Sequence, residues 1–374
     1  MQEYILWGGI FIAGLAVLIL TLIMLIRMAS SLPLIKKLGG SSRLKKAGIV
    51  IASLAVIMLT GSILIRFINT AIVLLHVMIF WLVLDLLGRF LVKERERRVT
   101  YSFWASLILT FTYMLMAAYW CFSVKPVNYV LHTSKASVDG LKVVFFADSH
   151  LGTTISGEGL NKYIDMINSE HPDVVLIPGD FVDDGTSREN MIKGCEALSH
   201  LETTYGVYYS FGNHDKGYSD VFTRGFSGDD LIRELEANGV VVLEDEAVLI
   251  DDSFYIVGRQ DKSEVSRGKG RDSASEVIEG LDMSRYIIVL DHQPGDYDAE
   301  AASHMDLVVS GHTHGGQLIP FLDVGVWLGV NDAVYGYERR ESTDFIVTSG
   351  ISDWELFFKS GCRSEYVVIE IQGA

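Results

Sequence analysis

Cysteine is scarce in this chain, and its few cysteines are scattered. The 374 residues include three of them, Cys121, Cys195 and Cys362, and no two form a Cys-x-x-Cys pair. We therefore expect neither a disulfide framework nor a thiolate metal site. Internal repeats and low-complexity stretches are also missing from the sequence, so an ordinary globular organisation is expected wherever the chain is not strongly apolar.

Basic residues are scarce in the larger, C-terminal part of the chain. Residues 1–125 hold thirteen Lys and Arg against four Asp and Glu, a balance of +9, whereas the remainder carries −25 of the total of −16. A nucleic-acid partner needs a basic footprint to match its phosphates, and the acidic part does not supply one. No nucleic-acid partner is therefore expected. Acidic side chains are instead suitable ligands for hard cations.

Charge is almost absent from four stretches near the N-terminus. Each is long enough to cross a bilayer as a helix, and they cover Tyr4–Arg27, Ala47–Ile65, Thr70–Leu91 and Tyr101–Val124. The first stretch has no basic start and no small-residue cleavage site, which argues against a cleaved signal peptide. We expect a four-span membrane domain over residues 1–125, a juxtamembrane linker over 126–139 and a globular domain over 140–374.

The basic residues between the apolar stretches predict an orientation. Lys and Arg are concentrated at 36–46 and 93–98, whereas the connection between the second and third stretches holds little more than Arg66. Loops rich in Lys and Arg stay on the cytoplasmic side of a membrane. The sequence therefore predicts a multi-pass protein of the cell membrane whose globular domain is extracytoplasmic.

From Lys142 onward, short apolar runs alternate with amphipathic segments. Strands are expected at 141–147, 173–177, 207–211, 240–243, 248–250, 254–257, 286–290, 307–309, 345–347 and 366–371. Helices are expected at 159–169, 188–201, 229–238 and 297–303. This alternation predicts an α/β domain with helices on both faces. The three runs between 240 and 257 are typical of a meander.

Residues of the kind that bind metals follow five of the predicted strands. The five blocks are Asp148-Ser149-His150, Gly179-Asp180, Gly212-Asn213-His214-Asp215, Asp291-His292 and Gly311-His312-Thr313-His314. Any one block has an ordinary explanation as a turn or a helix cap. All five, however, fall at the carboxyl ends of strands, where open α/β sheets bind their ligands. Together they predict a metal site built from imidazole and carboxylate groups.

These blocks resemble those of the calcineurin-like metallophosphoesterases, and the resemblance covers about residues 140–374. The block that starts Gly311-His312 and runs to Gln317, together with Leu290–Pro294, is most similar to a membrane-associated bacterial branch of that superfamily. The resemblance implies two mixed β-sheets sandwiched between helices. It says nothing about the four apolar stretches.

The resemblance also implies a role for each block. The first metal is expected on Asp148, His150 and His314, the second on Asn213, His292 and His312, and Asp180 is expected to bridge them. The ions are expected to be divalent Mn, Fe or Zn, and a hydroxide between them would attack phosphorus in line with the leaving group. His214 corresponds to the catalytic histidine and is not expected to be a ligand. Asp215 is expected to contact the other ring nitrogen of His214. We expect Asp183 to contact and orient the metal ligands without binding a metal itself.

The leading hypothesis is a membrane-anchored, two-metal hydrolase of phosphate monoesters or diesters, with lipid-linked or envelope substrates favoured because the domain is held beside a bilayer. The alternative is a membrane sensor or transporter with a ligand-binding, catalytically weak phosphoesterase-like domain. The presence of both Asp180 and His214 argues against it. A purely structural scaffold would leave the five blocks unexplained. No substrate-binding residue is assigned, although Trp354 is a candidate for the rim of the substrate entrance.

Overall fold

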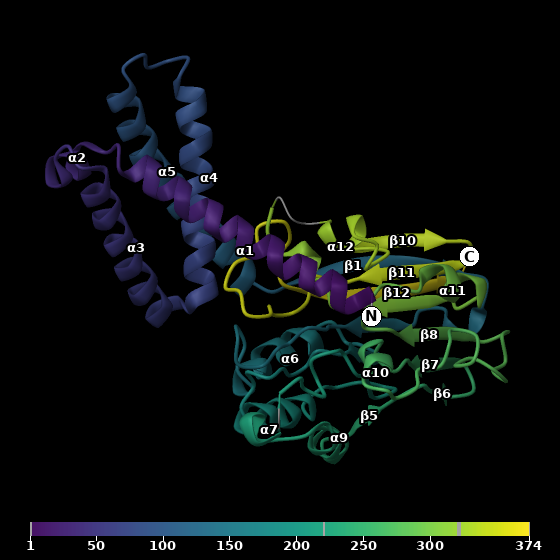
Figure 1. Ribbon diagram of the computed structural model, residues 1–374. Helices are drawn as coiled ribbons and strands as arrows, with labels where there is room; N and C mark the ends of the chain where they lie inside the picture. The colour runs from purple at the N-terminus through teal and green to yellow at the C-terminus, as the bar shows by residue number, and fades with distance from the viewer. Residues whose placement is uncertain (1, 220, 320–322, 374) are drawn as a thin grey trace. The chain divides into compact units, whose positions relative to one another are not determined.

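A computed structural model describes residues 2–219, 221–319 and 323–373 of the chain. The chain forms two compact units, residues 1–116 and residues 117–374. The first unit is helical and the second contains all the described strands (Figure 1). This division separates the apolar, basic part of the sequence from the acidic part.

The first unit consists of five helices, the last of which continues into the second unit. They are α1 (Gln2–Ala29), α2 (Pro33–Gly39), α3 (Arg43–Ile65), α4 (Phe67–Gly88) and α5 (Arg95–Phe122). Among the described residues α3, α4 and α5 are long and apolar enough to cross a membrane, and the bent pair Gly14–Ala29 and Pro33–Gly39 adds a fourth span if it is counted as one. The expectation of apolar N-terminal helices that can span a membrane is confirmed.

Two details of this unit differ from the expectation. The basic loop after the first apolar stretch contains α2, which begins at Pro33, and proline is favoured at a first helical position because its missing N–H costs nothing there. The connection between α3 and α4 is a single residue, Arg66, whose φ of 67° reverses the chain sharply.

The second unit contains two six-stranded mixed sheets (Figure 1). The first sheet has the order β1 (Lys125–Thr133), β12 (Glu365–Gly373), β2 (Lys142–Phe145), β3 (Val174–Pro178), β4 (Val207–Ser210) and β5 (Val240–Val242). The second has the order β10 (Gly336–Arg340), β11 (Thr343–Val347), β9 (Leu307–Ser310), β8 (Tyr286–Leu290), β7 (Phe254–Gly258) and β6 (Glu246–Ile250). The two mixed sheets confirm the predicted fold class.

Alternation of side chains along the strands builds the layers of this domain. In β2, Val143 and Phe145 join the core between the sheets, whereas Val144 faces the core beneath the helices α6 (Asn161–Asn168), α7 (Arg188–Leu198) and α9 (Gly228–Ala237). The outer face of the second sheet is covered in the same way by α11 (Tyr297–Ala302) and the segment 274–281. Because successive strand residues point to opposite faces, fully apolar strands of this kind fit sheets that are buried on both sides.

The segment expected as a juxtamembrane linker, residues 126–139, contains most of β1, which pairs in parallel with β12 along nine residues. The side chains of Tyr129 and Leu131 add to the core between the sheets, which explains why this segment orders. The predicted meander between 240 and 257 is divided, since β5 belongs to the first sheet and β6 and β7 to the second. β10, an edge strand rich in charge, was not predicted.

Candidate metal centre

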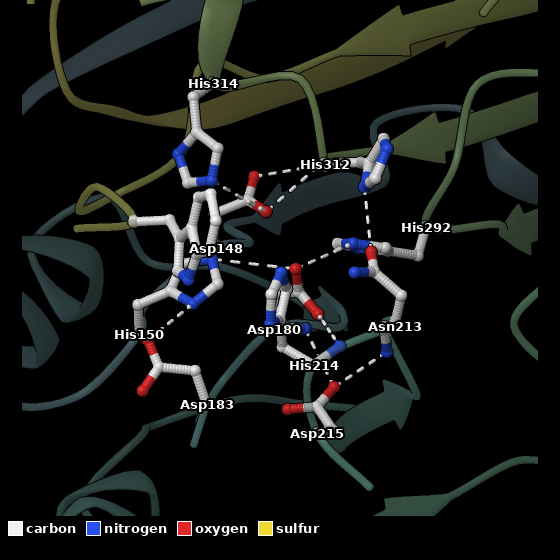
Figure 2. A network of polar contacts seen from close by, with 12 residues as sticks. Asp148, His150, Asp180, Asp183, Asn213, His214, Asp215, His292, His312 and His314 are labelled. Atoms are coloured by element: carbon white, nitrogen blue, oxygen red, sulfur yellow. Dashed lines mark hydrogen bonds and ion pairs between the residues drawn. The ribbon is translucent and has the colours of Figure 1, made fainter. Parts of the chain in front are cut away.

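The carboxyl ends of two groups of parallel strands meet at one place. β2, β3 and β4 are parallel neighbours in the first sheet, and β8 and β9 are parallel neighbours in the second. The two groups are joined there by a 2.8 Å hydrogen bond between His292 Nδ1 and the backbone oxygen of Pro178. Every one of the five sequence blocks follows one of these strands, so the fold brings all five together (Figure 2).

Glycine lets the loops after β3 and β4 approach each other. A Cβ atom on Gly179 would lie 2.2 Å from the backbone nitrogen of Gly212, and a Cβ on Gly212 would lie 2.3 Å from Oδ1 of Asp180. Gly179 also has a φ of 79°, which side chains disfavour. Both glycines of the Gly-Asp and Gly-Asn-His-Asp blocks are therefore required for Asp180 to reach its position.

Several polar residues of the site have left-handed backbone conformations. The φ angles are 57° for Asp148, 36° for His150, 52° for Asp180, 72° for His312 and 49° for His314. Each such conformation costs on the order of 1–3 kcal/mol in a residue that is not glycine, and strain of this kind concentrates at functional sites. These backbone conformations therefore direct the side chains into the site at a cost in stability.

The side chains form two clusters of potential ligand atoms. Asp148, His150 and His314 make the first and Asp180, His292 and His312 the second, and the atoms within each cluster lie within 4.8 Å of one another. Asn213 adds an amide oxygen to the second cluster, 2.8 Å from His312 Nδ1. Asp148, His150 and His314 therefore lie together, and His292 and His312 lie together with Asp180 and Asn213.

Asp180 lies between the two clusters (Figure 2). Its Oδ2 atom is 3.1 Å from His292 Nε2 in one cluster and 3.6 Å from His150 Nε2 in the other. Neither of these buried nitrogens makes a hydrogen bond of good geometry within the part of the chain that the structure describes. Two inward-facing nitrogens with one carboxylate oxygen between them leave lone pairs that a cation would satisfy.

Burial dominates the protonation behaviour of the cluster. It lowers the pKa of His312 to about 3 and lowers the pKa of His214, and it raises the pKa of the Asp148 carboxyl to about 6. Burial also works against a charge on Asp180, but the neighbouring His292 outweighs it and holds the Asp180 pKa well below its usual range. An ionised Asp180 beside a neutral His312 is the state that ligates a metal.

His214 stands beside the clusters with aromatic rings on two sides. Its ring centroid is 5.1 Å from that of Trp354 and 5.3 Å from that of Tyr218, and these two side chains are 43% and 61% exposed. His150 also contacts it, with ring centroids 5.3 Å apart. The His214 ring is therefore adjacent to the potential metal ligands and lies, half-buried, between two partly exposed aromatic side chains.

The contacts of Asp215 differ from the expected ones. Its Oδ2 atom accepts hydrogen bonds from the backbone amides of Asp180 at 2.8 Å and Gly212 at 2.7 Å, and its Oδ1 atom accepts from Val182 at 3.1 Å. The carboxylate thus ties the two glycine loops together instead of meeting the His214 ring. The position of Asp215 directly after His214 does not show that their side chains meet, because adjacent side chains point in different directions.

Asp183 and Asp353 each lie beside the Nδ1 atom of a histidine of the first cluster. Asp183 Oδ2 is 3.2 Å from Nδ1 of His150, which agrees with the support expected from the sequence. Asp353 Oδ1 is 3.4 Å from Nδ1 of His314, an arrangement that the sequence did not predict. Asp353 belongs to no motif, and its only signal was its place next to Trp354, the candidate for the rim of the substrate entrance.

Comparison with known proteins agrees with this geometry. Residues 141–316 match the family described as calcineurin-like phosphoesterase. The chain is 30% identical over 306 residues to an uncharacterised metallophosphoesterase of Campylobacter jejuni, covering 78% of this chain and 75% of that protein. The chain belongs to the calcineurin-like phosphoesterase family. It is thus a hydrolase of phosphoric esters.

Other relatives are longer than this chain. A transmembrane protein with a metallophosphoesterase domain from Bos taurus is 29% identical over 263 residues, and the match covers 67% of this chain and 57% of that protein. The zebrafish protein of the same description is 30% identical over 250 residues, and the match covers 54% of it. The chain thus spans little more than half the length of these two relatives. A solved dimetal phosphatase from zebrafish is also similar, with 12% identity, a TM-score of 0.34 and coverage of 57% of this chain and 88% of that one.

Membership in this phosphoesterase family implies a two-metal centre, and the residues present fit one. The two three-residue clusters each have imidazole and carboxylate groups, and all six residues are buried except His312, which is half-buried. Imidazole suits Zn and Fe, and carboxylate suits Mn, so the mixed donor set allows the three expected ions without choosing among them.

Proposed function

We propose that Asp148, His150 and His314 hold one divalent ion, that Asn213, His292 and His312 hold the other, and that Asp180 bridges the two. The position of Asp180 Oδ2 between His292 Nε2 and His150 Nε2, at 3.1 and 3.6 Å, is the observation that carries this proposal. When bound, such a pair of ions supplies Lewis-acid activation of water and neutralises charge on the phosphoryl group.

His214 is proposed to act on the reacting phosphate ester. Its side chain is adjacent to both clusters but belongs to neither, and its backbone amide donates a 2.8 Å hydrogen bond to Asp180 Oδ1. Burial favours the neutral ring, but an approaching phosphate brings negative charge that favours the protonated one. A protonated His214 would donate its proton to the leaving alcohol oxygen.

The aromatic walls beside His214 favour a particular kind of leaving group. Trp354 and Tyr218 border the ring from two sides and keep exposed surface. Planar or apolar groups pack on aromatic faces more favourably than small polar alcohols do. We infer that the substrate is a phosphate ester whose leaving group carries aromatic or acyl-chain surface, which includes lipid-linked esters.

A membrane location of the enzyme is supported by three to four apolar helices. The relatives named as transmembrane proteins with a metallophosphoesterase domain support the same proposal. The concentration of Lys and Arg at 36–46 and 93–98 supports a multi-pass arrangement in which the phosphoesterase domain is extracytoplasmic. Envelope phosphate esters are the substrates compatible with that side.

The proposal is tested with the purified full-length protein. After removal of metals with a chelator, addition of Mn²⁺, Zn²⁺ or Fe²⁺ is expected to restore hydrolysis of a chromogenic phosphodiester, with two equivalents bound per chain. Hydrolysis that survives complete removal of metals would overturn it. A protein that binds two equivalents and a phosphate ester but does not hydrolyse the ester would instead be the ligand-binding sensor.

A further inference from the structure

Asp353 is a buried carboxylate with contacts on two sides. Its side chain is 0% exposed. Its Oδ1 atom is 3.4 Å from His314 Nδ1 and accepts a hydrogen bond from Gln317 Nε2, whereas its Oδ2 atom is 3.6 Å from the Sγ atom of Cys121. One carboxylate therefore links a residue of the first metal cluster to the last turn of α5, a turn that belongs to the second unit.

Asp353 lies beside one ring nitrogen of His314, at an ion-pair distance without a hydrogen bond of good geometry, and the other ring nitrogen faces the cluster. Nδ1 of that ring is at Asp353, and Nε2 faces Asp148, with Oδ1 at 3.9 Å. A carboxylate on one ring nitrogen keeps the proton there, leaves the other nitrogen free to bind a metal and restricts rotation of the ring. His150 has the same arrangement, because its Nδ1 is 3.2 Å from Asp183.

The loop that carries Asp353 is closed by a buried lysine. Lys359 is 0% exposed, and its ammonium donates to the backbone oxygens of Ser349 at 2.5 Å and Ser352 at 3.0 Å. These carbonyls lie just before Asp353 in the chain, so the lysine holds both ends of a short loop. A buried ammonium also offsets the charge of the buried carboxylate, which otherwise would be costly.

The segment after this lysine completes the end of α5. The last four carbonyls of a helix have no partner within it. Two of these carbonyls are capped here, because Trp120 O accepts from Ser364 N at 3.1 Å and Cys121 O accepts from the Ser364 hydroxyl at 2.6 Å. Before these last four residues, Ala117 O also accepts from Lys359 N at 3.0 Å. The end of α5 and the loop of Asp353 are therefore one hydrogen-bonded assembly.

We propose that Asp353 is a positioning residue that orients His314 toward its metal, and that the last turn of α5 holds Asp353 in place. The end of a helix that is apolar enough to cross a membrane thus becomes part of the support of the metal centre. This inference rests on the proposed function, since it requires His314 to be a ligand.

The first test measures metal binding rather than activity. Mn²⁺ is titrated by calorimetry into the metal-free, full-length protein and into Asp353→Asn, with Asp344→Asn as a matched control because Asp344 is also buried but lies at the start of β11. The wild type is expected to bind two equivalents. Asp353→Asn is expected to bind one of them about 10–100-fold more weakly, as loss of a carboxylate behind a ligating histidine does, and Asp344→Asn is expected to keep both.

The outcomes separate this inference from the function on which it rests. A wild type that binds no pair of ions contradicts the proposed metal centre itself. A wild type with two ions and an Asp353→Asn variant of equal affinity contradicts only the positioning role. The melting temperature of the metal-free variants is measured as well. If it falls for Asp353→Asn while affinity is unchanged, Asp353 is structural and the inference is wrong.

The second test addresses α5. Cys121→Ala removes the sulfur that faces Asp353, and Cys195→Ala removes an equally buried sulfur within α7 as the control. Cys121→Ala is expected to weaken the same metal site less than Asp353→Asn does, and Cys121→Ser is expected to restore it because a hydroxyl can also donate to the carboxylate. In the Asp353→Asn background, Cys121→Ala should add nothing. The link between α5 and the metal site would be excluded if Cys121→Ala alone left metal affinity unchanged. It would also be excluded if the losses of affinity from Cys121→Ala and Asp353→Asn simply added in the double variant.

Discussion

The backbone amide of His214 donates a 2.8 Å hydrogen bond to Oδ1 of Asp180, while Oδ2 of the same carboxylate faces the two histidine clusters. One residue thus contacts the backbone of the proposed general acid and lies where the proposed centre needs a bridging carboxylate. Geometry of this kind couples the position of His214 to the metal centre without making His214 a ligand.

Asp180→Asn should remove the anionic bridge while keeping an acceptor for the His214 amide. The variant is expected to lose hydrolysis and most of its bound metal, because two dications without a shared carboxylate repel each other. Elemental analysis of the purified protein checks this, with Asp344→Asn as the control for a buried carboxylate elsewhere. Two equivalents still bound in Asp180→Asn would exclude the bridging role.

His214→Ala should separate chemistry from metal binding. The variant is expected to keep two metal equivalents and to lose about 10²–10⁴-fold in rate, the usual contribution of general acid catalysis. The loss should be smaller for a nitrophenyl ester than for an alkyl ester, because a good leaving group needs little protonation. Equal losses on both esters would mean that His214 stabilises phosphoryl charge instead, and loss of metal would show that it is a ligand.

Asp215→Asn should destabilise the domain even without metals. The substitution removes at least one acceptor from the buried amides of Asp180, Gly212 and Val182, at a cost of about 1–3 kcal/mol for each amide left unpaired. Thermal unfolding of the metal-free protein measures the loss. If the melting temperature is unchanged and only the rate falls, Asp215 acts through His214 as the sequence first indicated.

Trp354→Leu should change substrate preference. Aromatic contacts contribute about 0.5–1.5 kcal/mol, so kcat/KM is expected to fall about 2–10-fold for esters with an aromatic leaving group. Esters of equally acidic alcohols without a ring should be little affected. Tyr337→Leu, which removes an equally exposed ring on β10, is the control. An equal fall for both classes of ester would rule out the aromatic wall as a source of specificity.

The orientation in the membrane is tested with reporter fusions. A reporter after Ala374 is expected to behave as exported, and a reporter fused within the basic stretch 93–98 as cytoplasmic, because Lys and Arg are retained on the cytoplasmic side. The opposite pair of signals would reverse the topology and move the substrate to the cytoplasm.

Local sequence was sufficient for most of the helices and strands and for choosing the residues that the fold brings together at the candidate site. Apolar length predicts the N-terminal helices, and the strands of the second unit appear as apolar runs, because a buried strand needs side chains that suit both of its faces. The candidate residues, among them Asp148, Asn213 and His292, could be selected because their blocks follow directly on strands and contain glycine or a second metal-type residue.

Only the tertiary structure decided how distant segments meet. β1 could be recognised only through its partner β12, which lies more than two hundred residues later, because the backbone of an edge strand orders on the neighbour that pairs with it. The contacts of Asp215 and Asp353 are of the same kind. Which amide or imidazole a buried carboxylate meets depends on the loops that fold around it, and neither its sequence neighbours nor its motif specify that choice.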